Sequence, residues 1–329
     1  MMTEVLPALL DSDAYELDIF PADHLAFFAP KVVTSNPAKA YLISLESAKS
    51  KQTMLSNLNT VARMSGYLNI DQCPWSELLN RQYIQMIIGV LAAADKAPAT
   101  VNTYLAGIKG VALEAWTMKQ IDTETYQHVK TIKQSKGTRI AKGRALRSEE
   151  LIELFKTCDN SKMNKALRDS AILAVLLGCG LRRSELVSLD MKDINWQEGS
   201  LKVLGKNNKE RLSFMPKGTK KRLKTWIDEV RGEEAGAVFI RVRRHDDLVY
   251  TRITDQAIYH ILKDLRLKAG VEAFSPHDLR RTFASMMLTN GEDIITVRDS
   301  MGHANVATTE KYDHRDDQRL RDASDRLEI

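Results

Sequence analysis

Cysteine is scarce in this sequence, and long apolar runs are missing. The three cysteines, Cys73, Cys158 and Cys179, are odd in number and widely separated, and no pair has CxxC spacing. This argues against a disulfide framework and against a zinc knuckle. No stretch approaches the ~18 consecutive apolar residues that span a bilayer, and the N-terminus lacks the basic start and apolar core of a secretory signal. We therefore expect a reduced, cytoplasmic protein.

Internal repeats, low-complexity tracts and a GxxxxGK[ST] phosphate-binding loop are also absent from the sequence. Of its 329 residues, 43% are hydrophobic and 28% are charged, which is a globular composition and argues against disordered and fibrous proteins. A chain of this length exceeds one ordinary hydrophobic core, so we expect two domains.

Charge is distributed unevenly along the chain. Residues 1–35 contain six acidic residues and one lysine, whereas the whole chain carries a formal net charge of +5. The acidic residues of this arm are Glu4, Asp11, Asp13, Glu16, Asp18 and Asp23. A basic body behind an acidic arm indicates a polyanionic partner for the body, although many soluble proteins are mildly basic without one.

Hydrophobic periodicity divides the rest of the chain into two mostly helical regions. Residues 36–129 predict four or so short helices, which form a small all-α domain, with N-caps at Ser76 and Thr100. Residues 148–329 predict a second domain whose first helix is capped by Ser148.

Short strands interrupt the helices of the second region. Ser200–Leu204 and Glu210–Met215 flank a turn rich in glycine and asparagine and predict a β-hairpin. Val238–Ile240 is a candidate third strand. The expected fold class is therefore mainly α, of the α+β type, with a small antiparallel β-sheet in the second domain.

Residues 130–147 join the two regions and carry only basic charges. Seven lysines and arginines occur there without an acid, and two glycines interrupt any helix, so we expect an extended linker. Six of these bases are candidates for contact with a DNA phosphate backbone: Lys130, Lys133, Lys136, Arg139, Lys142 and Arg144. A solvated interdomain linker explains the segment equally well.

Four clusters of polar residues are not explained by helical or strand periodicity. They are GLRRSEL at 180–186, GKNNKER at 205–211, HDLRRTFAS at 277–285 and GHANVATTEKY at 302–312. Their side chains suit a phosphodiester, because guanidinium groups bind phosphate oxygens in pairs, histidine and lysine move protons, and tyrosine is a nucleophile. Each residue alone has an ordinary structural explanation, and the functional interpretation rests on the ordered set.

The order and spacing of these clusters resemble the tyrosine recombinase (phage integrase) family, most closely its Xer-like branch, from about Asn36 to the C-terminus. The resemblance implies a SAM-like, four-helix core-binding domain over 36–129 and a catalytic domain over 148–329. It also implies that neither a metal nor a cofactor is needed, because arginines neutralise the phosphate and a phosphotyrosyl ester keeps the energy of the cleaved bond.

The resemblance assigns the phosphate-binding roles to three residues. Arg182 and Arg280 would clamp the scissile phosphate, and His303 would add a hydrogen bond to it. Glu185 matches the acidic partner of the first arginine in this family and would orient the site. Arg281, next to the second arginine, remains a structural or DNA-backbone candidate only.

The roles in bond cleavage fall to three further residues. Tyr312 would attack phosphorus and form a 3′-phosphotyrosine link. His277 would assist proton transfer at the tyrosine, and Lys206, in the hairpin turn, would protonate the departing 5′ oxygen.

These roles together imply conservative site-specific recombination. The partner would be double-stranded DNA with an inverted-repeat site, and a homotetramer would hold two such sites. The acidic arm at 1–35 is a candidate surface for an accessory protein or a neighbouring subunit, and a last helix over Asp316–Leu327 for a neighbouring protomer. The alternatives are a type IB topoisomerase-like nicking-closing enzyme and a catalytically idle DNA-binding regulator.

Overall fold

The computed structural model describes residues 35–137, 143–205, 209–303, 305–310, 312 and 324–325. The acidic arm except for Ser35, and the expected last helix except for positions 324 and 325, lie outside the described residues. The contacts divide the chain into an N-terminal unit, Met1–Ile140, and a C-terminal unit, Ala141–Ile329. The division falls inside the segment 130–147 that the sequence predicts as a linker.

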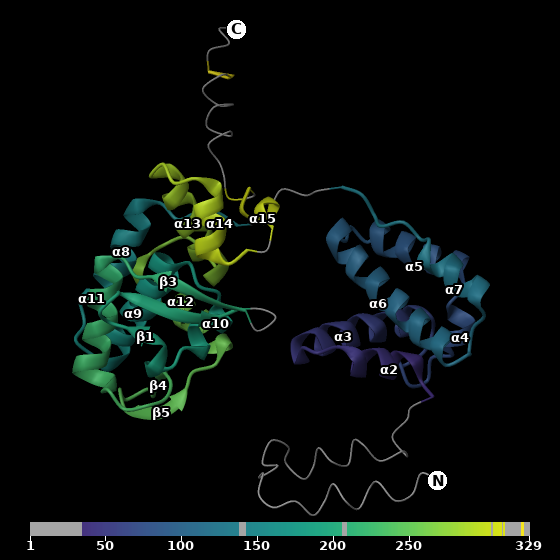
Figure 1. The fold of residues 1–329 in the computed structure, drawn as a ribbon, viewed down its shortest axis with the longest axis horizontal. Coiled ribbons are helices and arrows are strands. Elements are labelled where there is room, and N and C mark those ends of the chain that lie inside the picture. Colours follow the sequence, from purple (N-terminus) through teal and green to yellow (C-terminus); the bar gives the residue numbers. More distant parts are fainter. Residues whose placement is uncertain are drawn as a thin grey trace, which may run out of the picture. The chain divides into compact units, whose positions relative to one another are not determined.

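The regular secondary structure in the described part of the N-terminal unit is all helical (Figure 1). Its helices are α2 (Pro37–Ser44), α3 (Ala48–Met64), α4 (Trp75–Leu78), α5 (Arg81–Ala93), α6 (Pro98–Thr117) and α7 (Thr123–Lys130). Helix α6 is central, because α2, α3, α4, α5 and α7 all contact it. Its buried side chains, among them Leu105, Ile108 and Val111, form the middle of one hydrophobic cluster.

Two helix starts in this unit differ from the sequence prediction. Ser76 does not cap one long helix, because the chain breaks after the single turn of α4. The side chain of Asn80 then accepts a hydrogen bond from the backbone N–H of Gln82 at 2.8 Å and starts α5. Helix α6 begins at Pro98 rather than after Thr100. Proline suits the first helical position because the N–H that it lacks would have no partner there.

The C-terminal unit combines helices with two small antiparallel sheets (Figure 1). The helices are α8 (Ser148–Asp159), α9 (Asn164–Cys179), α10 (Arg183–Ser188), α11 (Lys217–Trp226), α12 (Asp255–Ala269), α13 (Pro276–Thr289), α14 (Ile294–Met301) and α15 (Val306–Glu310), with a 3₁₀ turn, η4 (Met191–Asp193), and a π-helical turn, η6 (Ile227–Arg231). This architecture confirms the predicted fold class. In the described part of the chain, no helix has the length and apolar character needed to cross a membrane.

The predicted β-hairpin is present as the central part of a three-stranded sheet. Its strands are β1 (Ile194–Asn195), β2 (Ser200–Leu204) and β3 (Glu210–Phe214), in the order β1-β2-β3. In the hairpin register Val203 lies opposite Arg211. The third predicted strand begins two residues later than expected, as β4 (Ile240–Val242), and pairs with β5 (Leu248–Arg252) in a separate sheet.

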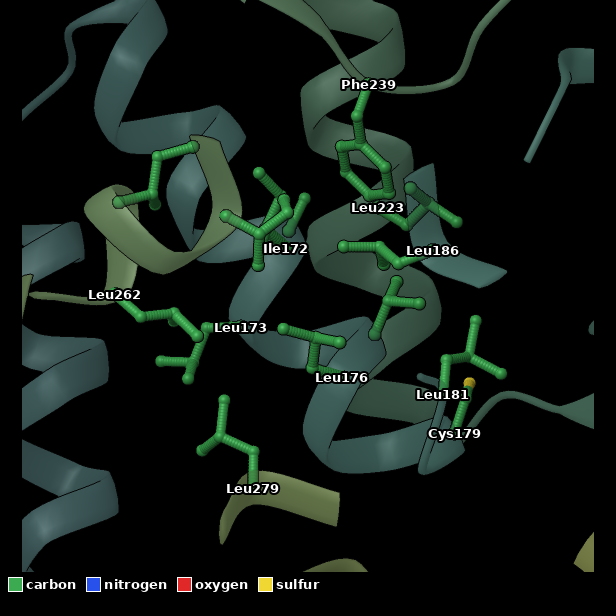
Figure 2. Packing of buried hydrophobic residues seen from close by; sticks show 14 of the residues in the cluster. Ile172, Leu173, Leu176, Cys179, Leu181, Leu186, Leu223, Phe239, Leu262 and Leu279 are labelled. Carbon is green, nitrogen blue, oxygen red and sulfur yellow. The ribbon is translucent and has the colours of Figure 1, made fainter. Parts of the chain in front are cut away.

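Helix α9 is the centre of the C-terminal core. It is buried over most of its length, and α8, α10, α11, α12 and α13 pack against it. Figure 2 labels side chains that meet in this core, from α9 to α13 and from the segments that hold Leu181 and Phe239: Ile172, Leu173, Leu176, Cys179, Leu181, Leu186, Leu223, Phe239, Leu262 and Leu279. Because α9 is surrounded on all sides, its end at Cys179 is a rigid starting point for the GLRRSEL segment.

Both described ends of the predicted linker are attached to the units beside them. On the N-terminal side, Ile132 is buried, and Ser135 exchanges two hydrogen bonds with the side chain of Asn102 at 2.8 and 3.1 Å. On the C-terminal side, the N–H of Leu146 donates to Thr282 Oγ1 at 2.8 Å. Residues 130–136 therefore belong structurally to the N-terminal unit and residues 144–147 to the C-terminal unit.

The first helix of the C-terminal unit begins differently from the prediction. Arg147 occupies the N-cap position of α8, and Ser148, the expected cap, is the first helical residue. The N–H of Arg147 donates to Glu150 Oε2 at 2.9 Å. A carboxylate in the first turn satisfies free N–H groups at a helix start, which explains why the serine side chain is not needed.

Gly180 allows the chain to leave α9 toward Arg182. It is the C-cap of α9 with φ of 58°, a left-handed conformation that residues with a Cβ adopt at a cost. A Cβ at this position would lie 2.3 Å from Cδ1 of Phe283. The turn therefore needs glycine both for its backbone angle and for its contact with α13.

Replacing Gly180 by alanine should lower the free energy of unfolding by ~1–3 kcal/mol, because the new methyl group both strains the backbone and overpacks against Phe283. Urea denaturation of the full chain measures this change. Gly218→Ala is the matched control, since Gly218 lies exposed in α11 and a methyl group added there would have no neighbouring atom within 4 Å. Equal stabilities of the two variants would contradict the role assigned to this turn.

Candidate active site

The structure describes six of the seven residues for which the resemblance implies a role at the site, and Lys206 lies outside the described residues. Each of the six stands at or near the end of a helix in the C-terminal unit. Arg182 precedes α10, Glu185 lies in α10, His277 and Arg280 lie in the first half of α13, His303 follows α14, and Tyr312 follows α15.

The carboxylate of Glu185 is the common partner of the arginines. Its side chain is only 3% exposed. Arg182 donates to it twice, from Nη1 to Oε1 at 2.5 Å and from the backbone N–H to Oε2 at 2.8 Å. Nη1 of Arg280 lies 3.9 Å from Oε2. The fold therefore brings together residues from two motifs that are widely separated in the sequence.

The carboxyl group of Glu185 stays ionised despite its burial. Burial by itself would raise its pKa, but hydrogen bonds from the Arg211 side chain and from the backbone of Arg182 oppose it, and the pKa is lowered to about 2. A buried carboxylate with this many donors is a fixed negative charge at any physiological pH.

Arg280 is the buried cation of the site, with a side chain that is 2% exposed. Its Nη1 donates to the carbonyl oxygen of Gly180, and its Nη2 donates to that of Met301 at 2.6 Å. Both carbonyls lie at helix C-termini, where partial negative charge favours a cation. Burial and then the neighbouring Arg182 lower the pKa of Arg280 to about 10, which leaves it charged near neutral pH.

Arg182 is the more accessible cation of the pair, since its side chain is 37% exposed. Besides its bonds to Glu185, its Nη2 donates to the carbonyl oxygen of Gly302 at 3.3 Å. This bond links the turn after α9 to the turn that carries His303. An anion approaching the site would therefore meet Arg182 directly and Arg280 in the layer beneath.

Tyr312 is held beside both histidines. Its side chain is 4% exposed, and Oη lies 3.1 Å from Nε2 of His277, within hydrogen-bond distance. The ring centroids of His277 and His303 each lie 6.0 Å from that of Tyr312. Oγ of Ser285 donates to the Tyr312 carbonyl oxygen at 3.3 Å, which ties the segment after α15 to α13.

The two imidazoles favour their neutral forms. Partial burial and then the charges of Arg280 and Arg182 lower the pKa of His303 to about 4. Partial burial, followed by Arg280 and Arg281, also lowers the pKa of His277. A neutral imidazole has one nitrogen free to accept a hydrogen bond, so His277 can accept the phenolic proton of Tyr312 through Nε2.

Two arginines of the site were not assigned to it from the sequence. Arg211, on β3, donates to both oxygens of Glu185, at 3.0 and 2.9 Å. The guanidinium carbon of Arg281 lies 5.4 Å from the centroid of the Tyr312 ring, a cation–π contact, and its side chain is buried. Nε of Arg281 has no hydrogen-bond partner among the described residues.

The strand pattern by itself does not reveal Arg211 as a residue of the site. In β3, Arg211 and Ser213 alternate with Leu212 and Phe214, so one pair must face inward. Hydrophobicity alone favours the apolar pair, yet Leu212 and Phe214 are 53% and 65% exposed. A charged residue in the inward row of a strand indicates a buried partner of opposite charge.

The basic candidates of the predicted linker fall into three groups. Lys130, Lys133 and Lys136 are exposed on the N-terminal unit. Arg144 instead forms two hydrogen bonds with Glu150, at 2.6 and 2.7 Å, so its guanidinium is engaged inside the C-terminal unit. Arg139 and Lys142 lie outside the described residues.

Side chains that could hold a metal ion do not gather anywhere in the described ranges: no group of three or more His, Cys, Asp or Glu residues has suitable geometry there. The three cysteines are free thiols and are buried. Burial raises the pKa of each thiol to about 12, which makes them poor nucleophiles.

His303 should make the stability of the protein depend on pH. Its pKa is about 4 in the folded chain against an ordinary value of 6.5, so the unfolded chain binds more protons in this interval. The free energy of unfolding therefore falls as the pH drops from 6.5 to 4. His303→Asn removes this contribution, and we expect the variant to lose less stability than the parent on acidification.

Urea titrations above pH 6.5 and at about pH 5 measure this difference. His260→Asn, which changes an exposed histidine of α12, is the control and should follow the parent. If His303→Asn loses as much stability as the parent between the two pH values, the lowered pKa of His303 in the folded chain is contradicted.

Comparisons with known proteins agree with the geometry of the C-terminal unit. Residues 144–319 match the sequence profile of the phage integrase family. The tyrosine recombinase XerD of Listeria monocytogenes is 30% identical over 245 residues, which cover 72% of this chain and 79% of the relative. XerD of Staphylococcus epidermidis is 27% identical over 278 residues, which cover 83% of this chain and 90% of the relative.

A solved structure extends the likeness to both units. The crystal structure of the XerH site-specific recombinase bound to its palindromic difH substrate, a post-cleavage complex, has a TM-score of 0.61 and 19% sequence identity, and the match covers 89% of this chain and 94% of that chain. At this identity the likeness concerns the fold. The family match spans more than half of the sequence, and the chain belongs to the phage integrase family of tyrosine recombinases, in its Xer-like branch.

Proposed function

We propose that this protein is a site-specific recombinase that cuts and rejoins duplex DNA through a 3′-phosphotyrosine intermediate, with Tyr312 as the nucleophile. The observation that supports this most directly is the hydrogen-bonding distance of 3.1 Å between Tyr312 Oη and His277 Nε2, beside the buried cation Arg280. A phenol, a neutral base and paired guanidiniums are the groups that attack on a phosphodiester requires.

In the proposed cleavage step, Tyr312 Oη forms a bond to phosphorus while the bond from phosphorus to the 5′ oxygen breaks. The phenolic proton passes to Nε2 of His277, which the lowered pKa of that residue keeps free to accept it. The departing 5′ oxygen takes a proton from Lys206, a role that rests on the resemblance alone. Rejoining is the same step in reverse, with a 5′ hydroxyl as the nucleophile.

The arginines stabilise the charge that builds on the phosphate oxygens during this step. Arg182, which is partly exposed, binds the phosphate directly, and His303 donates a further hydrogen bond. Arg280 contributes its charge from a dry environment, where electrostatic interactions are strongest. Its two carbonyl contacts keep it oriented before DNA arrives, so little reorganisation is needed at the moment of reaction.

The proposed DNA substrate is a duplex with inverted repeats, bound by four copies of the chain that hold two sites together. The core-binding domain (36–129), the basic linker (130–147) and the catalytic domain (148–329) would contact the duplex. The relatives named Xer recombinases, and the XerH structure solved with its palindromic difH substrate, support the duplex substrate. We further propose that the acidic arm at 1–35 meets an accessory protein.

Tyr312→Phe should abolish a covalent protein–DNA adduct while leaving DNA binding intact, because the phenylalanine ring fills the same space without a nucleophilic oxygen. The probe is a library of nicked suicide duplexes that carry inverted repeats, with adducts detected by denaturing electrophoresis. Tyr259→Phe, at an exposed position of α12, is the control and should form the adduct as the parent does.

Arg182→Ala and Arg280→Ala should still bind DNA but form the adduct ~10²–10³-fold more slowly, because each removes stabilisation of the developing charge. Equal loss of binding and cleavage would make the arginines structural. Binding by the parent without any adduct would support an idle DNA-binding regulator instead. Relaxation of supercoiled plasmid without recombinant product would support a topoisomerase-like enzyme.

Replacing Lys130, Lys133 and Lys136 together by alanine should weaken binding to any duplex by the same factor, since phosphate contacts carry no sequence information. The plot of log affinity against log salt concentration should become shallower by ~0.9 for each lost contact, or about 3 for all three. Fluorescence anisotropy over a salt series measures this slope. An unchanged slope would remove these lysines from the DNA interface.

A further inference from the structure

Arg211 lies within the charged cluster of the site, although the resemblance assigns it no role. It reaches inward from β3 with a side chain that is only 14% exposed. Nη1 and Nη2 donate to the two oxygens of Glu185 at 3.0 and 2.9 Å, a bidentate ion pair. Its Nε donates to the carbonyl oxygen of Ser300, in α14, at 3.4 Å.

These contacts join three separate segments of the chain. Glu185 belongs to α10, Ser300 lies two residues before the C-cap of α14, and Arg211 belongs to the hairpin. The fit is close: a Cβ on Gly302 would lie 2.9 Å from Cδ of Arg211, and one on Gly205 would lie 3.6 Å from Nη1. The backbone at Gly302 and at Gly205 therefore lies close to the Arg211 side chain.

The ion pair between Arg211 and Glu185 affects how much positive charge the other arginines of the cluster present to a phosphate. One carboxylate, Glu185, faces the guanidiniums of Arg182, Arg211 and Arg280. The pairing with Arg211 offsets part of the negative charge of Glu185, so less of the positive charge on the other two guanidiniums is neutralised. Without Arg211, the whole negative charge of Glu185 would act on Arg182 and Arg280, the two cations that the proposed mechanism needs for the phosphate.

We propose that Arg211 is a positioning residue that binds Glu185 and thereby keeps the positive charge of Arg182 and Arg280 available to the scissile phosphate. The proposal rests on the proposed function and deepens it. Arg211 itself does not touch DNA: its three side-chain nitrogens are directed to Glu185 and Ser300. Its loss should therefore slow the chemical step and leave DNA affinity nearly unchanged.

The test compares the rate of adduct formation at saturating protein with the affinity for the same nicked suicide duplex. Arg211→Met keeps most of the side-chain volume and removes the charge. We expect its cleavage rate to fall ~10–100-fold, as is usual when a supporting partner of reactive groups is lost, while affinity changes by less than about threefold. Arg222→Met is the matched control, because Arg222 makes a similar bidentate pair with Asp159 and contacts no residue of the site.

Removing the carboxylate distinguishes the electrostatic role from a merely structural one. In the double variant Arg211→Met with Glu185→Gln, the neutral amide no longer draws on Arg182 and Arg280, so cleavage should recover at least ~10-fold relative to Arg211→Met. A residue that only supports the fold would make the double variant worse than either single variant. Arg211→Lys keeps a positive charge beside Glu185 and should cleave at a rate between those of the parent and Arg211→Met.

Several outcomes would overturn the role of Arg211. Parent-like cleavage by Arg211→Met would do so, and so would a double variant no faster than Arg211→Met. If Arg211→Met does not fold, the lysine variant decides, because a loss of DNA affinity by Arg211→Lys as large as its loss of cleavage rate would contradict a role confined to positioning. A parent protein that forms no adduct at all would overturn the proposed function and the role of Arg211 with it. The other outcomes concern variants of a parent that does form the adduct, so they overturn the role of Arg211 alone.

Discussion

The site of the C-terminal unit depends on one buried carboxylate, that of Glu185, placed among three guanidinium groups. Burying a charge is costly unless it is paired and hydrogen-bonded, and this holds for the acid and for Arg211 and Arg280. Glu185 makes the burial of Arg211 and Arg280 tolerable, and the arginines in turn keep it ionised. Because these residues come from α10, β3 and α13, the same interaction aligns three separate segments of the chain.

The net positive charge of this cluster influences the protonation state of the two histidines beside it. It helps to keep the imidazoles of His277 and His303 neutral, since a further cation beside Arg280 would be repelled. A neutral His277 can accept the proton of Tyr312, whereas an imidazolium could not. A cluster of three cations and one anion also leaves positive charge for an incoming phosphate, which agrees with the family to which the chain belongs.

Much of the site could be predicted because its residues follow local signals that survive in the linear sequence. Gly180 ends the buried helix before Arg182, and Pro276 opens the helix that holds His277 and Arg280. Such boundaries depend on backbone angles and missing N–H groups, which are properties of single residues. The predicted hairpin and most helices follow from periodicity in the same way. The break between α4 and α5 could not be predicted from periodicity, because apolar residues continue across it. Only the N-cap residue Asn80 marks the start of α5.

The fold class, the order of the motifs and the chemical types of side chain in the site follow from the amino-acid sequence, because they depend on local propensity and on residue identity. Which charges meet depends instead on the packing of the folded chain. In β3 the row with Arg211 faces inward, where Arg211 pairs with Glu185, and the row with Phe214 faces outward, against the hydrophobic pattern. That partner lies 26 residues away in the chain, and pairing over such a distance leaves no periodic trace in the sequence.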